Sequence, residues 1–169
     1  MSFSVFEAAD GQRLKICGAV GEKFASFRQT GSRSTEAGGV LIGRWIVGQG
    51  DVVVDEATGP MTGDKRSRFG FFRSHREHQK AIDHAYEGSR GTVGYLGEWH
   101  THPERSPLPS SVDTDDWLRR LRQDVVDIKF VYFVIVGTNE TRVWRGSRVS
   151  RQLELMEMQS HHVKPPLSG

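Results

Sequence analysis

The spacing of apolar residues along the chain predicts short strands mixed irregularly with helices. Successive side chains of a strand face opposite sides of a sheet, so alternating or uniformly apolar runs predict strands. Such runs occupy residues 13–16, 38–47, 51–55, 65–73, 92–99, 129–136 and 141–145. Gly48-Gln49-Gly50 separates the second run from the third, which predicts a hairpin. In the run 65–73, we expect Phe69, Phe71 and Phe72 to supply buried surface.

Three further segments carry apolar residues at the spacing of one helical face. They are residues 20–29, 74–86 and 110–123. Ser74 is the expected cap of the second helix, and Gly88 its expected end. Residues 151–158 fit a strand and a helix equally well.

This irregular mixture predicts the α/β (mixed) fold class, with a mixed sheet flanked by helices rather than a regular doubly wound fold. A chain of 169 residues fits a single domain that buries roughly two-thirds of its unfolded surface. We expect this domain to span residues 1–158. Residues 159–169, which include Pro165-Pro166, are expected to form a flexible tail.

Composition narrows the possible partners and metal ligands. The net charge of +2 gives no bulk attraction to nucleic acid, so none is expected as a partner. No run approaches the ~20 apolar residues of a membrane span, and the first residues lack a signal pattern, so we expect a cytoplasmic protein without membrane contact. The sequence has one cysteine, Cys17. Histidine and carboxylate must therefore supply the ligands of any metal.

Two histidines at the end of a predicted strand are the first candidates for metal ligands. His100 and His102 are two positions apart, so in an extended chain both imidazoles face the same side. Catalytic zinc usually takes three protein ligands and leaves the fourth position for water. Asp113, on the first turn of the following helix, is the natural third ligand.

Each half of this group also has a structural interpretation. Ser110-Ser111-Val112-Asp113 has the Ser-x-x-Asp form of a helix capping box, in which the serine and the acid satisfy free backbone amides. A pair of histidines at a strand end is, by itself, more often structural than metal-binding. One short loop joins the two halves, and that proximity favours the metal site.

The combined pattern resembles the JAB/MPN (JAMM) metalloprotease family. His-x-His-Pro, six residues and then Ser-x-x-Asp form the signature of that family. The residues that carry the resemblance are His100, His102, Pro103, Ser110 and Asp113. The family also has an upstream glutamate followed by paired glycines and an apolar strand. Glu36, Gly38-Gly39 and the run that follows match this feature, and the resemblance extends from about residue 36 to about residue 144.

The resemblance implies a JAB/MPN-like fold and a role for each site residue. One zinc ion would be held by His100, His102 and Asp113. Glu36 would take a proton from the attacking water and pass it to the leaving amine. Ser110 would donate its hydroxyl to the developing oxyanion. The implied reaction is hydrolysis of an amide or isopeptide bond without a covalent intermediate.

A narrower resemblance points to a substrate. Residues 97–104, with Asp116-Trp117, are similar to the short bacterial JAB peptidases of ubiquitin-like conjugation operons in CBASS antiphage systems. Such a peptidase cleaves the bond after the C-terminus of a ubiquitin-like or nucleotidyltransferase (CD-NTase) protein conjugated to a target. The implied partner is thus a protein with an extended C-terminal tail. Two alternatives stay open: a processing peptidase for a ubiquitin-like sulfur-carrier protein, and a non-catalytic, zinc-stabilised MPN binding module.

The remaining candidate residues receive structural interpretations. His75, His78 and His84 lie on the predicted helix 74–86 and are interpreted as surface residues. Cys17 is interpreted as a buried structural thiol. Glu98 faces the same side of its strand as His100, so we hypothesise that it orients an imidazole.

Overall fold

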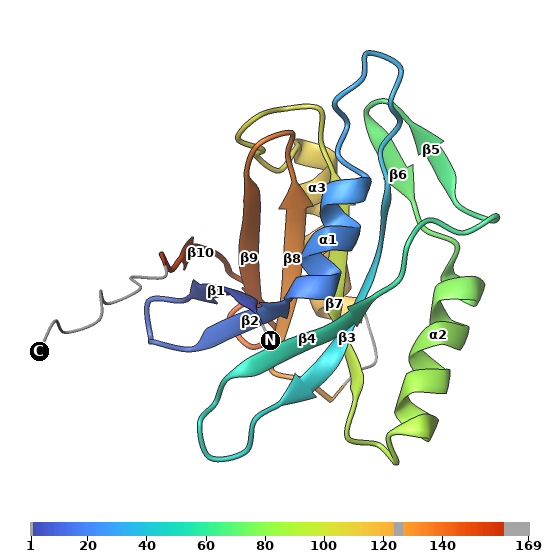
Figure 1. Cartoon of the computed structure of the whole chain (residues 1–169). Helices are drawn as coiled ribbons and strands as arrows, with labels where there is room; N and C mark the ends of the chain where they lie inside the picture. The colour runs from blue at the N-terminus through green and yellow to red at the C-terminus, as the bar shows by residue number, and fades with distance from the viewer. Residues whose placement is uncertain (1, 124–126, 161–169) are drawn as a thin grey trace, which may run out of the picture.

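Within the residues that the computed structural model describes, 2–123 and 127–160, eight strands close into one barrel (Figure 1). Around the barrel the order is β1-β10-β9-β8-β7-β3-β4-β2. These strands are β1 (Phe3–Glu7), β2 (Arg13–Cys17), β3 (Gly38–Trp45), β4 (Val52–Ala57), β7 (Gly94–Thr101), β8 (Phe130–Val136), β9 (Thr141–Ser147) and β10 (Leu153–Met158). The β2/β4 and β7/β8 pairs are parallel and the other pairs antiparallel, so the predicted mixed sheet is confirmed.

In the described part of the chain, three helices cover the sheet from two sides. They are α1 (Gly18–Ser26), α2 (His75–Gly88) and α3 (Ser111–Gln123). Figure 1 shows α1 in front of the strands, α2 beside β3 and α3 behind β8 and β9. The predicted arrangement of helices on the faces of a mixed sheet is therefore confirmed.

The alternation of side chains along β8 shows why both faces need cover. Tyr132, Val134 and Val136 belong to the interior cluster with Val20 and Phe24 of α1. The intervening residues face the opposite way and pack with α3. Because both faces of β8 are buried, its sequence is apolar throughout rather than alternating.

The predicted strand 65–73 is wrong as a single element. The chain forms two short strands, β5 (Lys65–Ser67) and β6 (Gly70–Phe72), which pair as a separate hairpin. Phe69 lies in the turn and is 76% exposed, and Phe72 is 63% exposed. The expectation that all three phenylalanines are buried is also wrong, because no second layer covers this hairpin within the described chain. Phe71 alone packs inward, against Gly38.

The two ends of the described chain complete the barrel in a way that the apolar pattern did not predict. Residues 153–158 form strand β10, which resolves the choice between strand and helix. An unpredicted strand, β1, pairs with β10 on one side and with β2 on the other. The predicted tail, residues 159–169, lies almost entirely outside the described residues.

One predicted surface histidine is buried. His78 has no exposed surface, its Nδ1 lies 2.7 Å from Thr58 Oγ1 and its Nε2 lies 2.9 Å from Asp64 Oδ2. Two polar partners make this burial possible, and neither is visible in the helical pattern. His75 and His84 are exposed, as expected.

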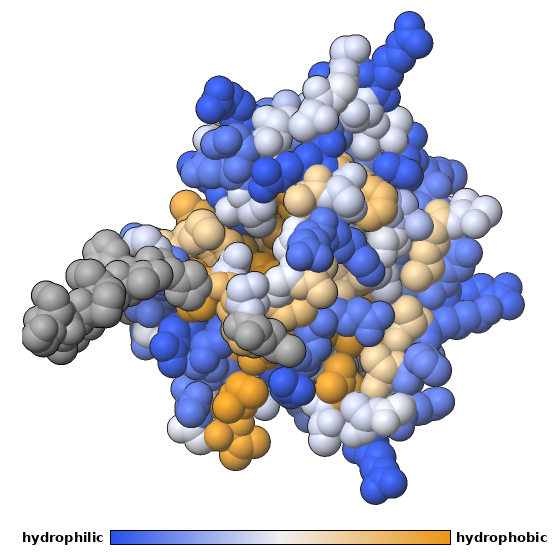
Figure 2. All heavy atoms as spheres, viewed as in Figure 1, coloured by the Kyte–Doolittle hydropathy of each residue, from blue (hydrophilic) through white to orange (hydrophobic). Residues whose placement is uncertain are grey.

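Figure 2 shows a largely hydrophilic surface on which apolar side chains appear in separate patches. In the part of the chain that the structure describes, no helix combines the length and the apolar character needed to cross a membrane.

Candidate metal centre and its groove

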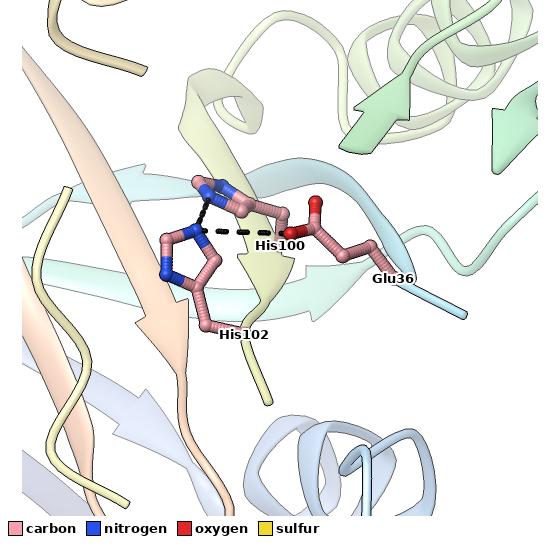
Figure 3. A group of neighbouring side chains, drawn as sticks. All are labelled: Glu36, His100 and His102. Carbon is pink, nitrogen blue, oxygen red and sulfur yellow. Dashed lines mark hydrogen bonds and ion pairs between the residues drawn. The ribbon is translucent and has the colours of Figure 1, made fainter. Parts of the chain in front are cut away.

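Three side chains from two segments of the chain converge at one end of β7 (Figure 3). His100 Nε2 and His102 Nε2 lie 3.0 Å apart, and Glu36 Oε1 lies 3.9 Å from His102 Nε2. Glu36 and His102 are buried, while His100 is half-buried. Such a Glu/His/His group is compatible with a metal ion.

Asp113 completes the group from a third segment, α3. Its Oδ1 lies 3.2 Å from His100 Nε2, and its Oδ2 lies 3.1 Å from His102 Nε2. Each oxygen of this carboxylate therefore lies beside the Nε2 atom of one of the two histidines. The structure thus brings together the residues that the sequence motif singled out: His100, His102, Asp113, Glu36 and, at the start of α3, Ser110.

The packing of α3 directs Asp113 toward the histidines. Trp117 is 3% exposed and stacks on Phe133 of β8, with ring centroids 4.7 Å apart and planes 14° apart. Residues four apart share a helical face, so the burial of Trp117 turns Asp113 toward the same strands. The Trp117 ring also lies edge-on to His100, with 6.4 Å between ring centroids.

The capping box at the start of α3 is also present. Ser110 N donates to Asp113 Oδ2 at 2.8 Å, and Asp113 N donates to Ser110 Oγ at 3.1 Å. The same Oδ2 faces His102. The structural and metal-binding interpretations are therefore compatible, because the capping carboxylate also lies beside both imidazoles.

Thr101, between the two histidines, fixes the strand from its opposite face. Its Oγ1 donates to Gln29 Oε1 and accepts from Ala37 N, each at 2.9 Å, and its backbone N donates to Ala37 O. Ala37 follows Glu36, so these bonds set the position of Glu36 relative to the histidines. The sequence analysis missed Thr101 and Gln29. The signal for Thr101 was its position: alternation turns the residue between two ligands into the core.

Close approach of backbones brings Glu36 to the centre. Gly38 pairs with His100 across β3 and β7, and a Cβ atom there would lie 2.5 Å from Trp99 O and 2.6 Å from the Phe71 ring. Only glycine fits such contacts. The hairpin holds the Glu36 backbone as well, because Glu36 N donates to Ser67 O and Arg66 Nε donates to Glu36 O, each at 2.7 Å.

Burial and neighbouring charges give the carboxyl groups different properties. Burial raises the pKa of Glu36 to about 7, although His100 and His102 oppose the shift. Burial also acts to raise the pKa of Asp113, but hydrogen bonds with His100 and His102 outweigh it and hold that pKa well below its usual range. Burial acts to lower the pKa of His102, and Asp113 raises it overall. Two carboxyls with such divergent pKa values suit different roles, a proton acceptor and a permanent anion.

The centre lies in a groove of about 1120 Å³. The β5–β6 hairpin, including Phe69 and Phe72, lines the groove, as does α3 with Val112 and Leu118. Apolar side chains therefore line the groove on both sides of the centre.

The hypothesis that Glu98 orients an imidazole is wrong. Its carboxylate is engaged by Arg73 NH2, from the segment after β6, and by Arg120 Nε of α3 at 2.9 Å. Glu98 lies on the same face of β7 as His100, as predicted, but its carboxylate forms ion pairs with two arginines from the flanking segments instead. Through these two ion pairs, Glu98 connects the β5–β6 side of the groove to the α3 side. Cys17 is half-buried, and its thiol donates to Asp55 O at 3.3 Å.

A family model described as prokaryotic homologs of the JAB domain matches residues 25–147, a span that includes all five converging residues. The chain belongs to this family. The JAB/MPN resemblance drawn from the sequence motif is thereby confirmed, and with it the predicted fold class.

Curated JAB relatives cover most of the chain. A Vibrio cholerae protein named CD-NTase/cGAS isopeptidase is 38% identical over 144 residues, which cover 85% of this chain and 87% of that protein. Proteins of the same name from Pseudomonas aeruginosa and Escherichia coli are 37% and 35% identical; they cover 82% and 78% of this chain, and the matches cover 87% and 80% of those proteins. These names support a hydrolase.

A solved structure supports the fold independently. The solution structure of a Desulfitobacterium hafniense protein aligns with a TM-score of 0.58 at 20% identity, covering 84% of this chain and 88% of that one. At this identity the likeness concerns the fold alone.

Proposed function

We propose that this JAB protein is a zinc-dependent isopeptidase that removes a CD-NTase from a target protein to which its C-terminus has been conjugated. The observation that carries the proposal is the meeting of Glu36, His100, His102 and Asp113 at one point of the groove. The names of the relatives supply the substrate class. We place the reaction in the cytoplasm, as the sequence predicts.

His100, His102 and Asp113 are the proposed zinc ligands. Two imidazole nitrogens and one carboxylate form a donor set typical of catalytic zinc sites, which leave one position for water. The Nε2 atoms of both histidines lie beside the Asp113 carboxylate, at 3.2 Å for His100 and 3.1 Å for His102, so the three groups face one point where an ion would sit. When bound, zinc lowers the pKa of a water molecule to about 7 and polarises the scissile carbonyl.

Glu36 is the proposed carrier of the proton. A carboxyl with a pKa of about 7 can accept a proton near neutral pH and release it again in the same turnover. It would take the proton from the attacking water and deliver it to the leaving lysine amine, so that hydrolysis balances. Its backbone is anchored by Ser67 and Arg66, which keeps the carboxylate directed at the histidines.

Ser110 is the proposed donor to the oxyanion. Its hydroxyl is exposed to the groove, and its oxygen accepts from Asp113 N, so its own proton is available to a ligand. Removal of one such donor typically costs about 2.7–4 kcal/mol of transition-state stabilisation.

The groove is the proposed seat of the extended C-terminal tail of the substrate. The tail would run between the segment of Glu36 and the loop of residues 104–109, with backbone hydrogen bonds giving affinity and pockets giving selectivity. The exposed rings of Phe69 and Phe72 offer apolar contacts at its edge.

A conjugate assay tests the proposal. The purified protein is incubated with a CD-NTase–target conjugate after zinc removal by a chelator and again after zinc is restored. Cleavage that disappears and returns with zinc is expected. Absence of cleavage in every condition would refute the isopeptidase. Preferential cleavage of a small sulfur-carrier fusion in a parallel reaction would instead support the function of a carrier-processing peptidase.

A further inference from the structure

One ring nitrogen of His102 is buried without a hydrogen bond. Nε2 faces His100 and Asp113, and Figure 3 shows the other ring nitrogen, Nδ1, turned away from Glu36 and His100. The His102 side chain is 7% exposed, and its Nδ1 has no hydrogen-bond partner in the described structure. Buried polar atoms almost always have a partner, so this nitrogen calls for one.

Metal binding at Nε2 would make a hydrogen-bond partner for Nδ1 more important. If Nε2 gives its lone pair to a metal, the proton of the neutral imidazole must sit on Nδ1. Nδ1 then becomes a donor in a buried place. Metal-bound histidines generally direct this N–H at a carboxylate, a carbonyl or a water, which fixes the orientation of the ring.

Glu104 is the carboxylate in reach. Its Oε1 lies 3.9 Å from His102 Nδ1, too far for a hydrogen bond but within the range of a side-chain rotation. The Glu104 backbone is held in place, because its carbonyl accepts from Thr138 N at 2.8 Å. Its side chain is 56% exposed and therefore has room to turn.

The present partner of Glu104 is weak. Its Oε2 accepts from Leu108 N at 3.3 Å, a long hydrogen bond in an exposed loop. The two oxygens of one carboxylate could serve Leu108 and His102 together, since each needs only one acceptor.

We propose that Glu104 is the positioning residue of His102: its carboxylate accepts the Nδ1–H of the zinc-bound imidazole and keeps Nε2 directed at the metal. This inference rests on the proposed zinc site and adds a residue that the His-x-His-Pro pattern does not include. Through Leu108 the same carboxylate ties the loop of residues 104–109, at the groove, to a metal ligand.

Zinc affinity tests the inference directly. The dissociation constant is measured by competition with a chromophoric chelator for wild type, Glu104→Ala, Glu104→Gln and the control Glu87→Ala, an exposed carboxylate on α2. Glu104→Ala should weaken zinc binding about 10- to 100-fold. Glu104→Gln should fall between the two because its amide oxygen still accepts, and Glu87→Ala should match wild type.

Nitrogen-15 NMR of the zinc-loaded protein supplies a second readout. The His102 Nδ1 proton should exchange slowly with water in wild type and faster in Glu104→Ala. A role of Glu104 confined to the loop would move neither this proton nor the affinity. The metal-free variants should unfold at the same temperature, which separates lost affinity from misfolding.

The failures are distinguishable. Zinc affinity of Glu104→Ala within twofold of wild type, or an equal loss in Glu87→Ala, would overturn the role of Glu104 and leave the zinc site intact. Failure of wild type to take up one zinc would instead overturn the proposed function itself.

Discussion

At the residue scale, the site depends on a carboxylate whose burial disfavours its charged form. Glu36 is 4% exposed and faces two histidines rather than water. The Glu36 backbone is held at two points. Its own N donates to Ser67 O, and the next residue, Ala37, is hydrogen-bonded to Thr101. The chain thus holds a proton acceptor whose pKa is raised by burial, although His100 and His102 oppose the shift.

Replacement of Glu36 by Gln should separate metal binding from proton transfer. Glutamine keeps the shape of the side chain but cannot accept the proton, so conjugate cleavage should fall by about 10²- to 10⁴-fold. Zinc content, measured by atomic absorption, should stay at the wild-type level. Cleavage at the wild-type rate would remove Glu36 from the role of general base.

Replacement of Thr101 by Val should destabilise the protein and slow cleavage. Ala37 N and Gln29 Oε1 would lose their partner in the core, which should lower the free energy of unfolding by about 1–3 kcal/mol. Urea unfolding measures this loss, with Thr101→Ser as the control that keeps the hydroxyl. Equal loss in both variants would mean that packing of the methyl group, and not the hydrogen bonds, holds the strand.

The sequence identified the residues proposed to carry the chemistry, which the structure brings together, but it did not identify the residues that hold them in place. Glu36, His100 and Asp113 belong to a motif of fixed spacing, and such spacing can be read directly. Gln29 reaches Thr101 across 72 positions of the chain, so no local pattern reveals it. The ion pairs of Glu98 were missed for the same reason, because both arginines lie in segments distant from Glu98 in the sequence.

At the element scale, each part of the groove has its own anchor. Helix α3 is fixed by the stacking of Trp117 on the barrel and by its capping box. The segment from β4 to α2 is fixed by the buried Thr58–His78–Asp64 group. Strong periodicity predicted the helices, whereas the β5–β6 hairpin was missed because its phenylalanines suggested a core that does not form over it.

Replacement of Asp64 by Asn should weaken the anchor of α2 in a pH-dependent way. Burial would raise the pKa of Asp64, but hydrogen bonds from the Met61 and Ser74 amides and from His78 outweigh it and lower that pKa. A carboxyl with a lowered folded pKa stabilises the protein above its unfolded pKa of about 3.9 and loses that contribution as the pH falls.

The variant should therefore be less stable than wild type by about 1–3 kcal/mol at pH 7. The difference should shrink below about pH 4. Chemical unfolding across this pH range tests the sign, with Asp83→Asn, an exposed position on α2, as the control. A difference that stays constant with pH would show that the charge of Asp64 contributes nothing.

At the scale of the whole molecule, the barrel and the site are built by the same strands. β7 lies between β3 and β8, so the histidines enter the groove from a strand hydrogen-bonded on both sides. The sequence predicted a mixed sheet but not its closure. Closure depends on the pairing of β1 with β10, near opposite ends of the chain, and apolar patterning carries no information about such pairing.

We propose that the assembled site hydrolyses the bond between the C-terminus of a CD-NTase and a lysine of its target. Intact-protein mass spectrometry of the reaction with zinc-loaded enzyme tests it most directly. We predict two products, the CD-NTase with a free C-terminal carboxylate and the target with its unmodified lysine. Cleavage within either protein, or a conjugate that stays whole, would rule out this reaction.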